Sequence, residues 1–483
     1  MRRVLVMLAL GLCATTLLAE TWANRHDTLA RNGRWISGKV GLARGVMGAV
    51  AFMTTRRPLS RNRLDLGSYF GFQEVLYSEP LDLAEIAFDF ELIHGAALTF
   101  LYGGDDGAFD AIRLSDASVA GLRITPEGGF AAREPIVAAA LGPGRHRLRV
   151  VFERDRVAVA LDDVPLPARP PVRASPQRFG FRSGAAHAFV DDIAIVTRDG
   201  RRVFESFHDW RDFALAWLAI GGLLTMAATA ALLFARRRAH APVLVTGVAL
   251  LGAALVLYLV DYYRLSARYP PPEHIDYQGY ATNIETEEEV VAGVQTRYGT
   301  APRADVARLL FLGTSQTWGA GAARLEDVFS ARIAAQLGTS YQVINVGISG
   351  SDSTRLLALY RERWLALAPR AVVVDLGNND PSPSVLTANL RALVALDRAH
   401  DIRTLLVVEP NAPEAHVDHD ASWNAMRAVA RELGVPLVDL HAELARRADS
   451  GFLFWDLVHL TSYGQRLAAE ILYPAIAELL RRQ

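Results

Sequence analysis

The stretch RLLFLGTSQTWG, residues 308–319, decides the fold of the second half of the chain. Its four apolar residues, 309–312, run without a break into a turn that begins at Gly313 and contains Ser315. A short apolar run of this kind, bounded by a turn signal, is typical of a parallel strand buried on both faces. The stretch therefore predicts a buried strand that leads through a tight turn into a helix.

The same pattern repeats along residues 306–483. Further apolar runs predict strands at 341–346, 371–376, 404–408 and 437–438. Helices are predicted at 326–337, 354–366, 385–400, 421–433 and 463–480. Strands that alternate with helices favour a parallel sheet that is covered by helices on both faces. Residues 306–483 are therefore predicted to form an α/β/α domain.

Polar motifs stand where several of these strands end. The motif GTSQTWG at 313–319 follows the first strand, NVGISG at 345–350 the second and GNND at 377–380 the third, and DLVH at 456–459 precedes the last helix. Ligands of open parallel sheets bind at the carboxyl ends of the strands. We therefore expect the four motifs to form one site.

The residue types in these motifs suit nucleophilic catalysis. A serine hydroxyl is a poor nucleophile until an imidazole removes its proton, and the imidazole needs a carboxylate to hold its tautomer. Ser315 and His459 supply the first two groups, and Asp456 lies three residues before the histidine, so one turn can present both. Taken singly, Ser315 could be a helix cap and Asn379 a turn former. The four motifs together favour a catalytic site.

The four motifs resemble blocks I, II, III and V of the SGNH hydrolases, a branch of the GDSL esterases. The resemblance implies a flavodoxin-like α/β/α fold and the hydrolysis of ester bonds. It implies that Ser315 is the nucleophile and that Asp456 and His459 complete the triad. The amides of Ser315 and Gly347 and the side chain of Asn379 would form the oxyanion hole. No cofactor or metal is predicted for the reaction.

Two features of this region fit the resemblance less well. The family usually has an aspartate before the serine, and this chain has Thr314, which puts the geometry of the turn in question. A loop after the fourth strand contains His416, Asp418, His419 and Asp420, which are residue types of metal sites. No family motif matches this loop, so a substrate-facing or solvated loop is favoured.

Residues 25–208 have a different pattern, in which short runs of alternating polar and apolar residues are separated by turn signals. Period-two patterning with regular turns predicts an all-β sandwich. The order of the runs at 146–150, 157–163, 178–182 and 189–193 resembles a concanavalin-like or laminin-G-like jelly roll. Such domains often bind glycans or calcium, and the pairs Asp105-Asp106 and Asp191-Asp192 could offer oxygen ligands. Carboxylates of turns and strand ends are the favoured interpretation.

Three apolar segments predict a membrane protein. Residues 1–22 have the charged start and apolar run of a signal peptide or an uncleaved anchor. Residues 213–235 and 243–260 are each close to the length that a transmembrane helix needs, and Arg236, Arg237 and Arg238 stand between them. The positive-inside rule places these arginines in the cytoplasm. Both large domains are then expected on the periplasmic face of the inner membrane, joined by the hairpin and a linker at 265–305.

The composition excludes several other classes of function. The net charge of −1 offers no basic field for nucleic acid. Cys13 is the sole cysteine and lies in the first apolar run, so no disulfide framework and no thiol nucleophile are expected. The sole lysine, Lys39, lies far from the motifs, which argues against Schiff-base chemistry at the predicted site.

These observations predict a membrane-anchored extracytoplasmic serine esterase that removes acyl groups, with acetyl favoured, from a carbohydrate polymer. One alternative is an O-acyltransferase that uses the same acyl-serine, which would need a multi-span acyl-export partner. Another is a glycan-binding scaffold that has lost catalysis. The expected partners are an acylated carbohydrate or small acyl ester and the lipid bilayer, with no nucleic acid.

Overall fold

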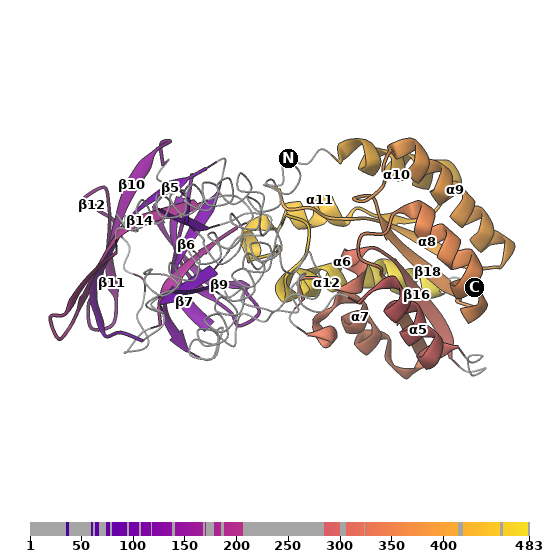
Figure 1. Ribbon diagram of the computed structural model, residues 1–483, viewed down its shortest axis with the longest axis horizontal. Helices are drawn as coiled ribbons and strands as arrows, with labels where there is room; N and C mark the ends of the chain where they lie inside the picture. The colour runs from indigo at the N-terminus through magenta and orange to yellow at the C-terminus, as the bar shows by residue number, and fades with distance from the viewer. Residues whose placement is uncertain are drawn as a thin grey trace, which may run out of the picture.

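The computed structural model describes residues 80–205, 285–299 and 306–481, with gaps inside the first and third ranges, and four short strands before residue 80. The gaps are 94–95, 106–107, 117, 138–140, 168–169, 171–177, 185–187, 323, 414–418 and 455–456. Figure 1 shows a β domain and an α/β domain side by side along the longest axis of the molecule.

The β domain contains two antiparallel sheets. The first has the order β1-β4-β13-β6-β7-β8-β9, and the second has the order β12-β11-β10-β5-β14-β3-β2, with β15 paired to β14. The strands of the first sheet are β1 (Trp35–Ser37), β4 (Glu74–Tyr77), β13 (Gly180–Ser183), β6 (Ala97–Asp105), β7 (Ala108–Ser115), β8 (Ser118–Ile124) and β9 (Phe130–Val137). Those of the second are β2 (Leu59–Ser60), β3 (Arg63–Leu66), β5 (Leu83–Leu92), β10 (Arg145–Phe152), β11 (Val157–Leu161), β12 (Val164–Pro165), β14 (Ala188–Thr197) and β15 (Arg202–Glu205).

Aromatic side chains from both sheets fill the space between them. Phe88 of β5 packs edge-on against Phe181 of β13, with ring centroids 4.8 Å apart, and contacts Phe100 of β6 at 5.5 Å. All three side chains are completely buried. Alternation of buried and less buried residues along β11 and β14 gives each strand one face toward this core. The predicted all-β domain is confirmed, whereas the specific jelly-roll resemblance stays a prediction.

The acidic pair Asp191-Asp192 lies at a strand irregularity in β14 and contacts an arginine. The Nη2 atom of Arg145 is 2.6 Å from Asp192 Oδ2 and 3.3 Å from Asp191 Oδ2, and its Nε donates to Asp89 at 2.7 Å. The two carboxylates therefore lie inside β14 and are paired with Arg145, whereas the sequence favours carboxylates of turns and strand ends. Asp106 of the other predicted pair lies outside the described residues, and so does the side chain of Asp105.

The α/β domain has a five-stranded parallel sheet with the order β17-β16-β18-β19-β20. Its strands are β16 (Ala307–Gly313), β17 (Tyr341–Asn345), β18 (Ala371–Leu376), β19 (Arg403–Val408) and β20 (Leu437–Val438). Its α-helices are α5 (Glu287–Tyr298), α6 (Ser315–Trp318), α7 (Phe329–Leu337), α8 (Ser353–Leu359), α9 (Pro383–Ala399), α10 (Asp420–Leu433), α11 (Leu440–Ala445) and α12 (Ser462–Arg481). The five predicted strands and five predicted helices are all present, with α7 and α8 beginning or ending in short segments of other helix types.

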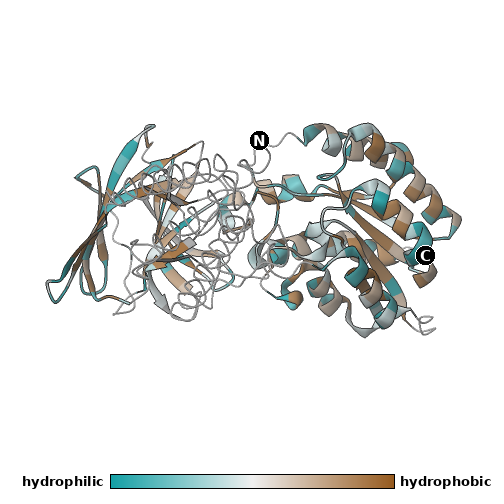
Figure 2. Cartoon of the chain, in the orientation of Figure 1, coloured by the Kyte–Doolittle hydropathy of each residue, from teal (hydrophilic) through white to brown (hydrophobic). Residues whose placement is uncertain are grey.

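Both faces of this sheet are buried, as the unbroken apolar runs predict. Along β16, Leu310 and Leu312 belong to one core with residues of α8, α9 and α10. The alternating residues Leu309 and Phe311 belong to a second core with residues of α7, α11 and α12. In Figure 2 the strands of this sheet are coloured hydrophobic, and the helices around them carry hydrophilic residues. Neighbouring residues of β16 thus hold different helix layers in place.

Helix α5 lies in the segment that the sequence predicts as a linker. Thr286 and Glu289 form a capping box at its start, with Glu289 Oε2 accepting from the Thr286 amide at 2.8 Å. Val290 and Val294 are buried in the same core as Leu310. The helix start is exposed, but the helix packs onto the α/β domain because its two valines share one face.

The three predicted membrane segments, 1–22, 213–235 and 243–260, lie outside the described residues. Among the helices that are described, none combines the length and the apolar character needed to cross a bilayer.

Candidate active site

Ser315 lies at the tight turn where β16 passes into α6. Thr314 caps the helix in extended geometry, and Gly319 ends it in the left-handed region with φ of 106°. Gly313 allows the close approach of the turn to the next strand, because a Cβ there would lie 2.0 Å from Thr317 Oγ1 and 2.6 Å from Asp375 O. The turn that the sequence predicts therefore presents Ser315 at the carboxyl end of the sheet.

His459 meets Ser315 across 144 residues of chain. Its Nε2 atom is 2.8 Å from Ser315 Oγ, a hydrogen bond in which the imidazole can accept the hydroxyl proton. The exposed fraction is 8% for Ser315 and 1% for His459. This pair is therefore withdrawn from bulk water, and electrostatic interactions are stronger in such a buried site than in water. Asp456, predicted to be the third member of the triad, lies outside the described residues.

The predicted oxyanion donors lie in the three segments that follow β16, β17 and β18, and the Gly347 amide is engaged elsewhere. The Gly347 amide donates to Asn345 Oδ1 at 2.9 Å, and a Cβ on this glycine would lie 2.2 Å from Trp318 N. Gly347 therefore lets its loop pack directly on α6. Asn345, which the sequence analysis passed over, also donates to Thr317 O at 2.5 Å and so ties the two loops together.

Of the other predicted donors, Asn379 has an N–H to spare and Ser315 lies at the start of a helix. Asn379 Nδ2 donates to Ser351 O at 3.1 Å, and a side-chain amide has a second N–H to offer. The Ser315 amide is in the first turn of a helix, where amides have no partner within the helix. Gly350, with φ of 73° and open space around it, is the other glycine of the loop that contains Gly347.

Comparisons with known proteins agree with this geometry. Residues 311–467 match the model of the GDSL-like lipase/acylhydrolase family. The C-terminal domain is a GDSL-type acylhydrolase domain. The protein is accordingly a hydrolase of ester bonds. No curated protein matches the chain.

Several solved structures are similar to the GDSL domain at low identity. The acetyl xylan esterase AlAXEase is 22% identical over 35% of this chain and 99% of its own, with a TM-score of 0.32. A two-domain esterase, CEX, active on acetylated mannans is 18% identical over 40% of this chain and 54% of its own, with a TM-score of 0.32. The lipase/acylhydrolase from Enterococcus faecalis is 20% identical over 37% of this chain and 99% of its own, also with a TM-score of 0.32.

Thr314, the departure from the GDSL pattern, is paired with a buried glutamate. Its hydroxyl donates to Glu409 Oε1, and the Asn378 amide donates to Glu409 Oε2 at 2.8 Å. Glu409 follows β19 and is completely buried. One carboxylate thus joins the residue before the nucleophile to the residue before Asn379. A single glutamate after an apolar run gave no signal in the sequence that could reveal this link.

A second buried carboxyl, Asp375, lies in the same region and accepts from Thr317 Oγ1 at 2.8 Å. Burial raises the pKa of Asp375 to about 7. Burial also raises the pKa of Glu409 well above its usual value, and the charge of Asp375 adds to the rise. Two carboxyls that share a dry site resist carrying charge together, so protons stay on this pair at pH values where solvated carboxyls are ionised.

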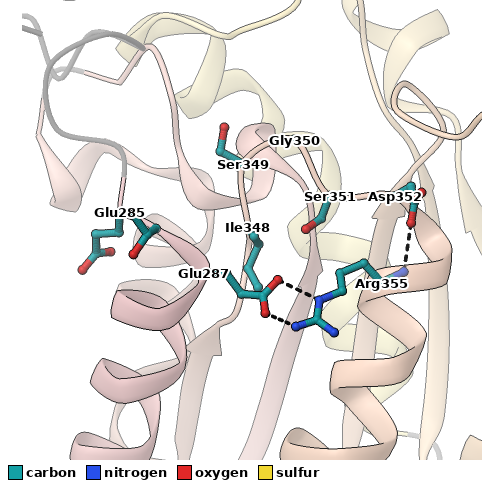
Figure 3. Close-up of a pocket in the computed structure, with 9 residues that line it drawn as sticks. Glu285, Glu287, Ile348, Ser349, Gly350, Ser351, Asp352 and Arg355 are labelled. Carbon is teal, nitrogen blue, oxygen red and sulfur yellow. Dashed lines mark hydrogen bonds and ion pairs between the residues drawn. The ribbon is translucent and has the colours of Figure 1, made fainter. Parts of the chain in front are cut away.

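An open cleft of about 430 Å³ lies beside the loop after β17. Figure 3 shows Ser349, Gly350 and Ser351 on one side of it and the start of α5 on the other. Arg355 spans the cleft wall and forms a bidentate ion pair with Glu287. Helix α5, which precedes the matched residues 311–467, thus forms one wall of this cleft.

The predicted metal-type loop is only partly described. His416 and Asp418 lie outside the described residues. The His419 ring lies 5.9 Å from the Trp423 ring, which stacks on His441 with ring centroids 3.9 Å apart. In the described part of the chain, no three His, Cys, Asp or Glu side chains are grouped as a metal site would require.

We predict that Asn379→Ala lowers kcat/KM for a small acetyl ester by about 10²- to 10³-fold, the usual cost of losing one oxyanion donor. Steady-state kinetics with p-nitrophenyl acetate would measure the effect. Asn389→Ala is the matched control, because that amide donates to Ser353 and Thr354 on α8 and is expected to change the rate only slightly. Full activity of the Asn379→Ala protein would remove Asn379 from the oxyanion hole.

The buried pair predicts that the GDSL domain loses stability as the pH rises. Between about pH 4.5 and 7, the folded state holds protons on Asp375 and Glu409 that the unfolded chain has released, so the unfolding free energy falls across this window. Glu409→Gln keeps both hydrogen-bond positions and removes one titrating group. The variant should show a shallower fall, measured by urea unfolding at several pH values, whereas exposed Glu326→Gln should behave like the parent. An unchanged slope in Glu409→Gln would contradict this account.

Proposed function

We propose that the protein is an extracytoplasmic, membrane-anchored esterase that removes small acyl groups, above all acetyl, from a carbohydrate polymer. The 2.8 Å contact between His459 Nε2 and Ser315 Oγ carries the proposal, because it joins nucleophile and base in the geometry that ester cleavage needs. The sequence of residues 1–22, 213–235 and 243–260 supports the membrane anchor and the external location.

The reaction follows from the positions of these groups. His459 Nε2 accepts the hydroxyl proton while Ser315 Oγ bonds to the acyl carbon, which converts the carbonyl oxygen into an oxyanion. The Ser315 amide and Asn379 Nδ2 donate to that oxyanion. The imidazolium then gives its proton to the leaving alkoxide, and the sugar hydroxyl departs. A water molecule, deprotonated by the same imidazole, then attacks the acyl carbon. As the bond to Ser315 Oγ breaks, the imidazolium returns its proton to Oγ and the carboxylic acid is released.

We place the leaving group in the cleft, because Ser351 lines it and accepts a hydrogen bond from Asn379 at its carbonyl. The lining of the cleft then supports a polar leaving group. Ser349, Ser351 and Asp352 face it from the loop after β17, and the Arg355–Glu287 ion pair lies across from them. Among the described residues that line this cleft, Ile348 has the one apolar side chain. Hydroxyl-rich sugars suit such a surface, because each side chain can exchange hydrogen bonds with them, whereas a long acyl chain requires apolar walls. A short acyl group therefore fits better than a fatty acyl group.

The charge of the cleft favours neutral glycans over acidic ones. In the described part of the lining, Glu285, Glu287 and Asp352 contribute three carboxylates and Arg355 the single cation. Like charges that face each other across a binding surface lower affinity. An O-acetylated neutral polysaccharide is therefore the proposed substrate, with the β domain as the part that holds the polymer.

We predict that the full-length protein releases acetate from an acetylated neutral polysaccharide and cleaves p-nitrophenyl acetate faster than the octanoate ester. Ser315→Ala should lose both activities and labelling by a fluorophosphonate, because each depends on the Ser315 nucleophile. The matched control Ser384→Ala, on the exposed start of α9, should keep all three. Faster cleavage of the octanoate ester would overturn the small-acyl proposal without affecting the assignment of Ser315.

The same assay separates hydrolysis from acyl transfer. Both reactions share the acyl-serine, and they differ in whether water or a sugar hydroxyl attacks it. Release of free acetate in the presence of excess deacetylated polymer supports the esterase. Reacetylation of that polymer in place of acetate release would favour the transferase.

A further inference from the structure

The β domain contacts the GDSL domain at the histidine loop, residues 451–461, which contains His459. Phe452, seven residues before His459, is 7% exposed and belongs to an apolar cluster whose other buried members all come from the β domain. Those members are Leu76, Leu101, Phe109, Ala111, Leu122 and Ile124. One side chain of the histidine loop is therefore buried in the other domain.

Two β-domain side chains hold the Phe452 ring. The Arg182 guanidinium of β13 lies 3.7 Å above the ring centroid, and the Phe130 ring of β9 meets it edge-on at 5.0 Å. Both arrangements are favourable for an aromatic ring, since cations lie over its face and ring edges point at it. The ring is thus held in a defined orientation as well as buried.

The turn between β8 and β9 also hydrogen-bonds to this loop. Gly128 O accepts from the Phe452 amide at 2.9 Å, and Gly129 pairs with Gly451 in an antiparallel bridge. Thr125 makes the turn rigid, because its amide donates to Gly129 O at 2.8 Å and its hydroxyl accepts from the Gly129 amide at 3.0 Å. A short stretch of sheet thus crosses from one domain to the other.

Glu127, at the tip of the same turn, reaches two helices of the GDSL domain. Its carboxylate accepts from Arg332 Nη2 of α7 at 3.3 Å and from Arg466 Nε of α12 at 3.0 Å. Arg466 lies in the first turns of α12, soon after His459. The turn at 125–129 therefore contacts residues on both sides of His459 in the sequence, Phe452 before it and Arg466 after it.

Hydrogen bonds at the base of the histidine loop link the position of Phe452 to that of His459. Thr461 N donates to Leu453 O at 2.9 Å, and Phe454 pairs with Leu460 in an isolated bridge. Residues on either side of His459 are thus hydrogen-bonded to each other and, through Phe452, to the β domain. A shift of Phe452 would move the base of the loop and with it the imidazole.

We propose that the β domain positions the catalytic histidine, with Phe452 as the anchor and the turn at 125–129 as the clamp, so that ester cleavage depends on the docking of the two domains. These are positioning residues, since they act on substrate only through His459. The proposal rests on the proposed ester cleavage by Ser315 and His459. It does not depend on which acyl group is removed or on which molecule bears that group.

A pair of glycine substitutions in the full-length chain tests the proposal. A Cβ on Gly129 would lie 2.5 Å from the Tyr463 ring, so Gly129→Val should push the turn off the histidine loop. Gly142, in another loop of the β domain, has nothing within 4 Å of a Cβ, and Gly142→Val is the control. Gly129→Val should lower kcat for p-nitrophenyl acetate by about tenfold or more with little change in KM, because small misplacements of a catalytic group cost rate. Gly142→Val should stay near the parent.

Two further readouts separate positioning from mere stability. Misplacement of His459 should slow fluorophosphonate labelling of Ser315 and shift the acid limb of the pH profile of kcat/KM. A merely structural interface would lower the Tm and leave both unchanged. Parental kcat in folded Gly129→Val, or equal losses in both glycine variants, would overturn the proposal.

If Gly129→Val does not fold, Glu127→Ala provides the test without adding bulk. Its control is Glu85→Ala, which removes a bidentate pair with Arg149 inside the β domain. The proposal expects a lower kcat in the first variant alone. Equal kcat values for these two variants would overturn it.

Discussion

The hydrogen bond between Ser315 Oγ and His459 Nε2 depends on the fold of the whole GDSL domain. It joins the turn after β16 to the loop before α12, two segments at opposite ends of the domain sequence. The parallel sheet brings them together because all its strands end at one edge, and layers of helices on both faces prevent that edge from moving. Gly313 and Gly347 then allow the backbone to come closer than any side chain would permit.

Two buried carboxyl groups hold the loops at the carboxyl end of the sheet in place. Glu409 links Thr314 to the Asn378 amide, and Asp375 holds Thr317. The residue before Ser315 and the residue before Asn379 are thus held by one side chain. Charge inside a protein is costly, so the pair keeps protons to a higher pH than solvated carboxyls do. Such a network ties the position of the site to the protonation of groups that take no direct part in the reaction.

The two domains meet at the loop that contains His459. Phe452 crosses from the histidine loop into the apolar face of the β domain, and Glu127 reaches back to Arg332 and Arg466. An apolar anchor flanked by charge-assisted hydrogen bonds is the usual construction of a defined interface. A polymer that binds the β domain would therefore lie against the same body that positions His459.

The sequence alone indicated the secondary structure of the GDSL domain, because buried parallel strands have unbroken apolar runs. It also indicated the type of chemistry, because serine catalysis needs a particular set of residue types. It predicted the five strands and the Ser315–His459 pair. Tertiary structure decided that Asn345 engages the Gly347 amide, how Thr314 is supported by Glu409, that α5 belongs to the domain core, and how the β8–β9 turn meets the histidine loop. These features depend on contacts between residues far apart in the chain, and such contacts leave no periodic pattern in the sequence.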